Sequence, residues 1–444
     1  MLRNLRLFLA ALAVMACCTG VSMAGMSDWE FFNLCERGKP DEIIAALKDG
    51  ANPRAGVEDR GWTALMNAAR NNPDPDAVRV LVKGGADVHA VDSQGWTALM
   101  LALRYNPDPR VARGLLRAAG DVWAKTVNAR NSEGMSAMMY AVRDRDAETI
   151  VALYKAGADV RAEDPDGVSA IMRGAAVNPD PEAVLALVEA GAGAGGFDSR
   201  GRSPLMWAAA NNPNPDVVSA LLESGANVYA RDKDDASVLM HAAAHNPNPE
   251  VLRVVLAART NPHLRDIFGR NALMYAARFN RNPDVATMLL QAGIAPDAKD
   301  KKGRTALSLG AAENGNPAIV AALVRFGAAI GAKDDLGMDA LMYAAGYNEN
   351  PEMTLAVLHA GGSVKATDKN GATALILAAR HTLRPEVIGS LLDAGADPAA
   401  KDKQGRRALD YAAQNPQVKG SQEHRRLYQA TAGADRQPAK KMKK

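Results

Sequence analysis

The chain has 444 residues, with 53 Lys and Arg against 50 Asp and Glu, so its formal net charge is only +3. A charge this close to balance excludes a protein that binds nucleic acid or acidic membranes through its overall electrostatic field. Aromatic residues make up 5% of a chain that is 48% hydrophobic, which indicates a core of closely packed helices and not of sheets.

The N-terminus has the pattern of a secretory signal peptide. Arg3 and Arg6 form a basic start, an apolar stretch of 12 residues follows, and a small-x-small cleavage site ends at Ala24. The apolar stretch is shorter than the ~20 residues that a bilayer-spanning helix needs. The sequence therefore predicts a signal peptide over residues 1–24 and an exported protein, periplasmic if the source is a Gram-negative bacterium.

Two other interpretations of this segment stay open. Cys17 lies in the stretch VMAC, which resembles the lipid-attachment site of bacterial lipoproteins, although Met15 fits that pattern poorly. A lipid anchor in the envelope, or secretion, are therefore alternative locations, and a buried N-terminal helix is the third interpretation. Cys35 is the only cysteine after the signal region, so no internal disulfide is expected, and Cys35 is expected in the core.

After a first, degenerate helix pair in residues 27–60, the sequence repeats itself every 34 residues, apart from one spacing of 39 and one of 33. The units begin at Gly61, Gly95, Gly134, Gly167, Gly201, Asp235, Gly269, Gly303, Gly337 and Gly371, and a partial unit begins at Gly405. In the Gly201 unit, residues 205–209 and 217–222 have the apolar spacing of two short helices, and Gly225 is placed to end the second one. Neither helix can bury its apolar face alone, so the units must stack.

The repeat resembles the ankyrin repeat. GWTALMNAAR (61–70) and GRSPLMWAAA (201–210) are similar to the family's T-P-L-H-x-A-A pattern, with Met in place of His, and LLESGANVYARD is similar to its second helix and turn. The resemblance implies an all-α ankyrin-repeat solenoid of about twelve stacked helix pairs with short β-hairpin-like fingers. We expect an N-terminal capping repeat (27–60), ten ankyrin-like repeats (61–404), a C-terminal capping repeat (405–430) and a basic disordered tail (431–444).

A connector that ends in proline separates the two helices in nine units, and in five of them a first proline lies two residues earlier, as in NNPNP (211–215). A helix is disfavoured before the first proline, whereas the second proline suits a first helical turn capped by the Asp or Asn before it. An asparagine precedes most connectors, and we expect its amide to bond to backbone groups of the adjacent unit. Solvated left-handed helix caps are the alternative. These asparagines are Asn72, Asn106, Asn178, Asn212, Asn246, Asn280, Asn314 and Asn348.

One unit departs from the pattern at both of its glycine positions. It begins with Asp235, and Arg259 replaces the glycine that ends the second helix. Either that cap is rebuilt or the array bends there.

Signals for catalysis are weak. His241 and His245 have the i, i+4 spacing of a two-histidine metal site, but the glutamate of a zinc protease and a good third ligand are missing. We therefore predict no catalytic residue, no metal site and no cofactor, and expect these histidines to line a groove.

The resemblance implies that partners bind to finger tips and to the exposed face of the first helices. One column on that face is rich in aromatic residues, with Tyr140, Trp207, His241, Tyr275 and Tyr343 among its members. Trp62 and Trp96 lie near finger tips, where exposed tryptophans would anchor a partner. Filling gaps between units, and simple repeat variation, are the alternatives for these residues.

The favoured function is a monomeric, non-catalytic scaffold that binds a protein partner in the cell envelope or periplasm. A secreted effector that binds host proteins is a second hypothesis, and a metal-dependent enzyme that uses His241 and His245 is a third. The sequence does not name the partner.

Overall fold

The computed structural model describes residues 25–57, 61–119, 126–143 and 146–436. The predicted signal peptide, the alternative lipid site Cys17 and residues 437–444 lie outside this part of the chain. The chain divides into two compact parts, which we call the first unit and the second unit; each contains several of the repeat units described above. The first holds residues up to 199 together with 223–225, and the second holds the remainder.

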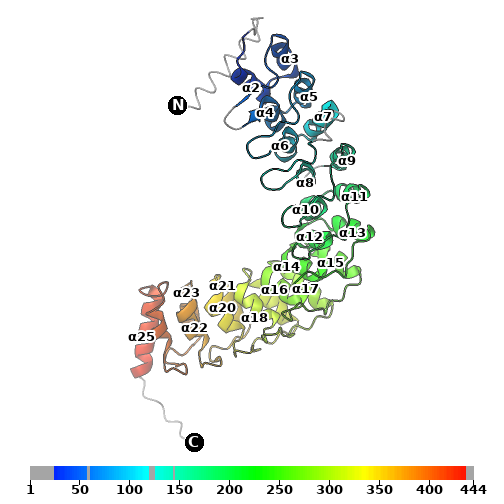
Figure 1. Ribbon diagram of the computed structural model, residues 1–444. Coiled ribbons are helices and arrows are strands. Elements are labelled where there is room, and N and C mark those ends of the chain that lie inside the picture. The colour runs from blue at the N-terminus through cyan, green and yellow to red at the C-terminus, as the bar shows by residue number, and fades with distance from the viewer. Residues whose placement is uncertain (1–24, 58–60, 120–125, 144–145, 437–444) are drawn as a thin grey trace. The chain divides into compact units, whose positions relative to one another are not determined.

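The described residues form 24 helices, which follow one another as twelve pairs (Figure 1). The pairs of the first unit are α2 (Asp28–Arg37) and α3 (Pro40–Lys48), α4 (Ala64–Asn71) and α5 (Pro75–Lys83), α6 (Ala98–Tyr105) and α7 (Pro109–Ala119), α8 (Ala137–Ala141) and α9 (Ala147–Lys155), and α10 (Ala170–Val177) and α11 (Pro181–Glu189). The expected architecture of about twelve helix pairs is therefore confirmed.

The second unit has the same organisation. Its pairs are α12 (Pro204–Asn211) and α13 (Pro215–Glu223), α14 (Val238–His245) and α15 (Pro249–Ala257), α16 (Ala272–Phe279) and α17 (Pro283–Gln291), α18 (Ala306–Glu313) and α19 (Ala318–Arg325), α20 (Ala340–Tyr347) and α21 (Pro351–His359), α22 (Ala374–His381) and α23 (Glu386–Asp393), and α24 (Ala408–Ala412) and α25 (Gln422–Arg436). Among the described helices, none combines the length and the apolar character that crossing a bilayer requires.

The first helix of each pair is buried by its neighbours. In the second unit, α16 packs between α14 and α18 and also lies against α17. Ala272, Leu273 and Ala276 of α16 are completely buried, and the small alanines let the neighbouring backbones approach closely. The partner helix α17 buries one stripe, which includes Val285 and Leu289. Cys35 of α2 is buried as expected, and burial raises the pKa of its thiol to about 12.

The connectors do what the two prolines predict. Pro249 is the first residue of α15, and the side chain of Asn248 accepts a hydrogen bond from the backbone N–H of Glu250. In α19 and α23 the helix begins one residue later, because Pro317 and Pro385 occupy the N-cap position.

The asparagine before the connector bonds to the preceding unit. The side-chain amide of Asn280 donates to the carbonyl of Ala243 at 3.1 Å and to that of Asn246 at 2.7 Å, and its oxygen accepts the N–H of Asn282. The backbone of Asn280 is extended and not left-handed. The predicted bonding of this asparagine to the adjacent unit is thereby confirmed, and we call the series of these bonds the asparagine ladder. The same donation to the previous unit is made by Asn72, Asn106, Asn178, Asn246, Asn314, Asn348 and Asn415.

This ladder solves a general problem of helix ends. The last carbonyls of a helix have no partner within the helix, and a buried carbonyl without a partner is costly. The carbonyl of Ala243 belongs to the last turns of α14, and Asn280 reaches it from the end of α16. Each unit therefore completes the hydrogen bonding of the unit before it.

The fingers are minimal hairpins. The first is a two-stranded antiparallel sheet in which β1 (Gly56–Val57) pairs with β2 (Trp62–Thr63), and other fingers are reduced to single bridges such as Arg231 opposite Ser237. Fingers also bond to one another within the second unit, as the N–H of Lys301 does to the carbonyl of Phe268 at 2.9 Å.

Two departures from the repeat are visible in the backbone. Asp235 and Arg259 are the only residues other than glycine with positive φ among the described residues, with φ of 62° and 59°. The helix cap is therefore not rebuilt at Arg259. It keeps a left-handed conformation that costs a side chain about 1–2 kcal/mol relative to a right-handed one.

The C-terminal boundary expected at residue 430 is wrong. Helix α25 continues to Arg436, so residues 431–436 are helical and not part of a disordered tail. Thr431 is buried and donates to the carbonyl of Leu427 at 2.7 Å, and Asp435 pairs with Arg407 at 2.8 Å. Burial of Thr431 and the ion pair between Asp435 and Arg407 hold this end of the helix against the fold.

Replacement of Asn280 with alanine should lower the free energy of unfolding by about 2–4 kcal/mol, because two carbonyls and one N–H lose their partner. Urea unfolding followed by circular dichroism measures this loss. Asn282→Asp is the matched control, since it keeps the cap and loses only an exposed bond to the carbonyl of Pro247. A loss below about 0.5 kcal/mol for Asn280→Ala would contradict the ladder's role.

Arg259→Gly should stabilise the protein by about 0.5–1 kcal/mol, because glycine adopts a positive φ without a steric penalty. Asp235→Gly should change stability little, because Asp235 also pairs with Arg231 at 2.7 Å and glycine would lose that contact. Thermal melting of the two variants checks this difference, and a melting temperature of Arg259→Gly that does not rise would show that the strain assigned to Arg259 is absent.

Candidate functional site

Several fingers are tied to the first helix of their own unit by the carboxylate that begins the finger. In the finger 266–271, one oxygen of Asp266 accepts the N–H groups of Phe268 and Arg270 at 2.9 and 2.8 Å. The other oxygen accepts the hydroxyl of Tyr275 at 2.8 Å and Nε of Arg270 at 2.7 Å. Tyr275 lies on α16, so one buried aspartate joins finger, arginine and helix.

The predicted aromatic column makes this same contact in several units. Tyr343 donates to Asp334 at 2.6 Å, and Nε2 of His241 lies 2.8 Å from Asp232. In the first unit, Tyr140 accepts from the amide of Asn131 at 2.8 Å. Burial and then the bond to a carboxylate raise the pKa of Tyr275 and of Tyr343, so both are protonated donors at neutral pH.

The column therefore makes contacts within the fold more than it lines a groove for a partner. Tyr140 is only 3% exposed, and burial raises its pKa to about 12. Leu101, Leu309 and Leu377, which occupy the same position of the first helix in other repeats, are buried as well. Their burial supports the alternative that some members of the column fill gaps. Trp207 is half-buried beneath the guanidinium of Arg202, 4.1 Å from the ring centre.

The two finger tryptophans differ in exposure. Trp62 is half-buried in β2. The exposure expected for Trp96 is wrong, because its ring is 8% exposed and stacks on Tyr140 with 4.9 Å between ring centres. Arg70 lies between aromatic rings of two successive repeats. Its guanidinium is 5.7 Å from the ring centre of Trp62 and 4.6 Å from that of Tyr105.

The first unit thus gathers three predicted residues, Trp62, Trp96 and Tyr140, into one aromatic group. An open hollow of about 400 Å³ lies beside it. The side chains of Arg104, Arg143, Glu133 and Asp166 give the hollow a mixed charge. Because positive and negative side chains both occur in its lining, the hollow favours neither an anionic nor a cationic ligand.

Sequence reasoning missed two aromatic residues of the second unit that are in fact exposed. They end the first helices, one turn beyond the predicted column: Phe279 is 39% exposed and Tyr347 is 48% exposed in the second unit. His245 lies 5.6 Å from the ring centre of Phe279, and Tyr347 stacks on His381 at 5.2 Å. We call these four residues the aromatic row. Their i, i+4 spacing from the predicted column places them on the same helix face, but it does not show that they are exposed.

The two histidines weighed as metal ligands have other contacts. His241 bonds to the finger aspartate and His245 packs on Phe279. Among the described residues, no three His, Cys, Asp or Glu side chains come together in an arrangement that could hold a metal ion.

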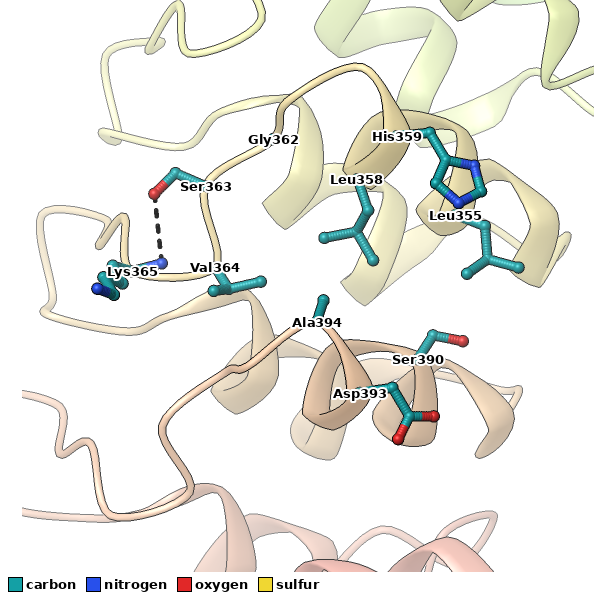
Figure 2. A pocket seen from close by; sticks show the side chains of 10 residues that line it. All are labelled: Leu355, Leu358, His359, Gly362, Ser363, Val364, Lys365, Ser390, Asp393 and Ala394. Atoms are coloured by element: carbon teal, nitrogen blue, oxygen red, sulfur yellow. Dashed lines mark hydrogen bonds between the residues drawn. The ribbon is translucent and has the colours of Figure 1, made fainter.

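A hollow of about 500 Å³ lies on the side of the second helices, between α21 and α23 (Figure 2). Leu355, Leu358 and Val364 form its apolar part, and Gly362 lies where neighbouring units bury a small side chain such as Ala396. The charge of Asp393 at its edge is paired with Arg426 at 2.6 Å. His359 and Ser390 also line the hollow, and the Ser390 hydroxyl donates to the carbonyl of Glu386 at 3.2 Å.

Comparison with known proteins places the chain in a family. A search among curated proteins finds no match. The family model for ankyrin repeats in three copies matches residues 31–126, 138–232, 239–334, 308–402 and 341–427. These ranges cover far more than half of the chain, which therefore belongs to the ankyrin repeat family, whose repeats are generally protein–protein interaction modules.

Proposed function

We propose that this chain is an exported, monomeric, non-catalytic scaffold that binds a protein partner through its fingers and the ends of its first helices. The observation that carries the proposal is the aromatic row of the second unit, in which large side chains of an otherwise aromatic-poor chain are exposed beside arginines.

The row has the chemistry of interaction hot spots. Aromatic side chains and arginine dominate the binding energy of protein interfaces. The guanidinium of Arg278 lies 4.6 Å from the ring of Phe279, so an aromatic surface and a cation are presented together. Because α16 and α20 are fixed by the asparagine ladder, the row changes shape little on binding, and less conformational entropy is lost.

The location is proposed from the N-terminal segment alone. A basic start, an apolar stretch and a small-x-small site ending at Ala24 favour export with cleavage, to the periplasm of a Gram-negative cell. The lipid-anchored form through Cys17 is the outcome that the export experiment must distinguish.

Phe279→Ala combined with Tyr347→Ala should reduce capture of the partner by at least tenfold, because each alanine removes an exposed anchor from the row. The measurement is crosslinking in the source cells followed by mass spectrometry of the captured proteins. Tyr229→Ala combined with Tyr428→Ala is the matched control, since both tyrosines are exposed but lie outside the first helices. Equal capture by the two double variants would refute the aromatic row as the binding surface.

Trp96 is not suitable for this test. Its ring is buried, and alanine there would cost about 3–5 kcal/mol of stability through the cavity it leaves. Any loss of capture would then report unfolding.

The mature protein should begin at Gly25 and fractionate with soluble periplasmic proteins. N-terminal sequencing and fractionation of the source cells measure both properties, and Cys17→Ser should change neither. Retention of Cys17 as a lipid-modified N-terminus, with release from membranes only by detergent, would replace this proposal with the anchored form.

A further inference from the structure

A basic notch lies beside the aromatic row in the second unit. Two successive fingers and the end of α16 line it, with Phe268, Arg270, Arg278, Asp300, Lys301, Lys302 and Arg304. The notch encloses about 290 Å³. Small-molecule sites usually enclose ~300–1,000 Å³, so the notch suits one or two side chains better than a whole cofactor.

The arginines of the notch are held in place by acidic partners. Nε of Arg270 contacts Asp266 at 2.7 Å, and Arg304 contacts Asp300 at 2.8 Å. Asp266 and Asp300 are committed to their fingers, where each also accepts two backbone N–H groups. Nε of Arg278 contacts Glu313 at 2.7 Å. All three arginines are therefore fixed, and already paired with a carboxylate, before any ligand arrives.

The lysines supply the charge that is not balanced. Lys301 and Lys302 are exposed, and within the described residues their ammonium groups make no ion pair. The charge of each arginine is balanced by a carboxylate of this chain, so the unpaired ammonium groups of the two lysines are what favour an added carboxylate in the notch.

The fingers on either side are acidic and limit the size of the anion. The preceding finger carries Asp234 and Asp235, and the following finger carries Asp334 and Asp335. Asp335 lies against Gly303, directly beside the notch. A long polyanion such as nucleic acid would meet these carboxylates at both ends, whereas a short acidic stretch flanked by neutral or basic residues would not.

Apolar surface adjoins the charge. Phe268 is 46% exposed and Arg270 lies 4.4 Å from its ring centre, while Arg278 links the notch to Phe279 of the aromatic row. A segment that combines carboxylates with apolar side chains would contact both surfaces at once.

We propose that the basic notch binds one or two carboxylate side chains of an acidic peptide segment in the protein partner, while apolar neighbours of that segment rest on Phe268 and Phe279. This inference rests on the proposed function and names the chemistry of the partner.

The test uses the full mature chain and fluorescein-labelled peptides of twelve residues with a central Phe-Glu-Glu-Leu or Phe-Gln-Gln-Leu. Fluorescence polarisation should show binding of the glutamate peptide that weakens as NaCl rises from 50 to 300 mM, and at least tenfold weaker binding of the glutamine peptide. Lys301→Ala combined with Lys302→Ala should weaken binding of the glutamate peptide by about threefold to thirtyfold.

The matched control is Lys369→Ala combined with Lys403→Ala, because these lysines occupy the position of Lys301 in later fingers. It should change affinity less than twofold. Equal weakening by both double variants, equal affinity for the two peptides, or no binding of the glutamate peptide at millimolar concentration would overturn the proposal. Tighter binding of labelled oligo-dT than of the glutamate peptide would instead assign the notch to nucleic acid. If the peptide test fails but capture of the partner still depends on Phe279 and Tyr347, the proposal for the notch is rejected and the proposed function is not.

Discussion

The fold depends on one hydrogen-bonded contact repeated between units. The first helix of each pair ends with buried carbonyls, and the asparagine of the next unit supplies the donors for them, as Asn314 does for Ala277 and Asn280 at 2.8 Å each. The same asparagine orders the connector by accepting the N–H of Asn316. Burial of the apolar helix faces and hydrogen bonding of the buried helix ends therefore both require the adjacent repeat. This explains why the chain keeps a proline-containing connector in nearly every repeat.

The second recurring device is the aspartate at the start of the finger. It satisfies two N–H groups of the finger and still offers one oxygen to a side chain on the first helix, as Asp334 does to Tyr343. Where the first helix presents a tyrosine or a histidine, as with Tyr275 and His241, the device fixes the finger on its helix. It also uses the polar ends of Tyr275 and Tyr343 within the unit, and so leaves the outer turn of the first helices, where Phe279 and Tyr347 lie, as the surface exposed for contact.

The sequence was sufficient for the repeat, the helix pairs, the connector and the asparagine ladder, because these follow from local spacing and from proline and amide chemistry. It was insufficient for Trp96 and Tyr140, whose burial depends on a ring-on-ring contact between neighbouring units. The exposed row was missed because period alone does not say which turn of a short helix emerges beyond its neighbours. The end of α25 was also missed, since the contacts of Thr431 and Asp435 have no counterpart in other repeats.

If each repeat is held by the hydrogen bonds that the next repeat makes to its helix ends, loss of one asparagine should destabilise only the repeats beside it. Hydrogen exchange with mass spectrometry on the full chain carrying Asn314→Ala tests this most directly. We expect faster exchange in α16 to α19, which flank the lost rung, a smaller effect in α14 and α20, and no change in α2 to α5. A uniform loss of protection along the whole chain, or no loss beyond residue 314 itself, would contradict the account.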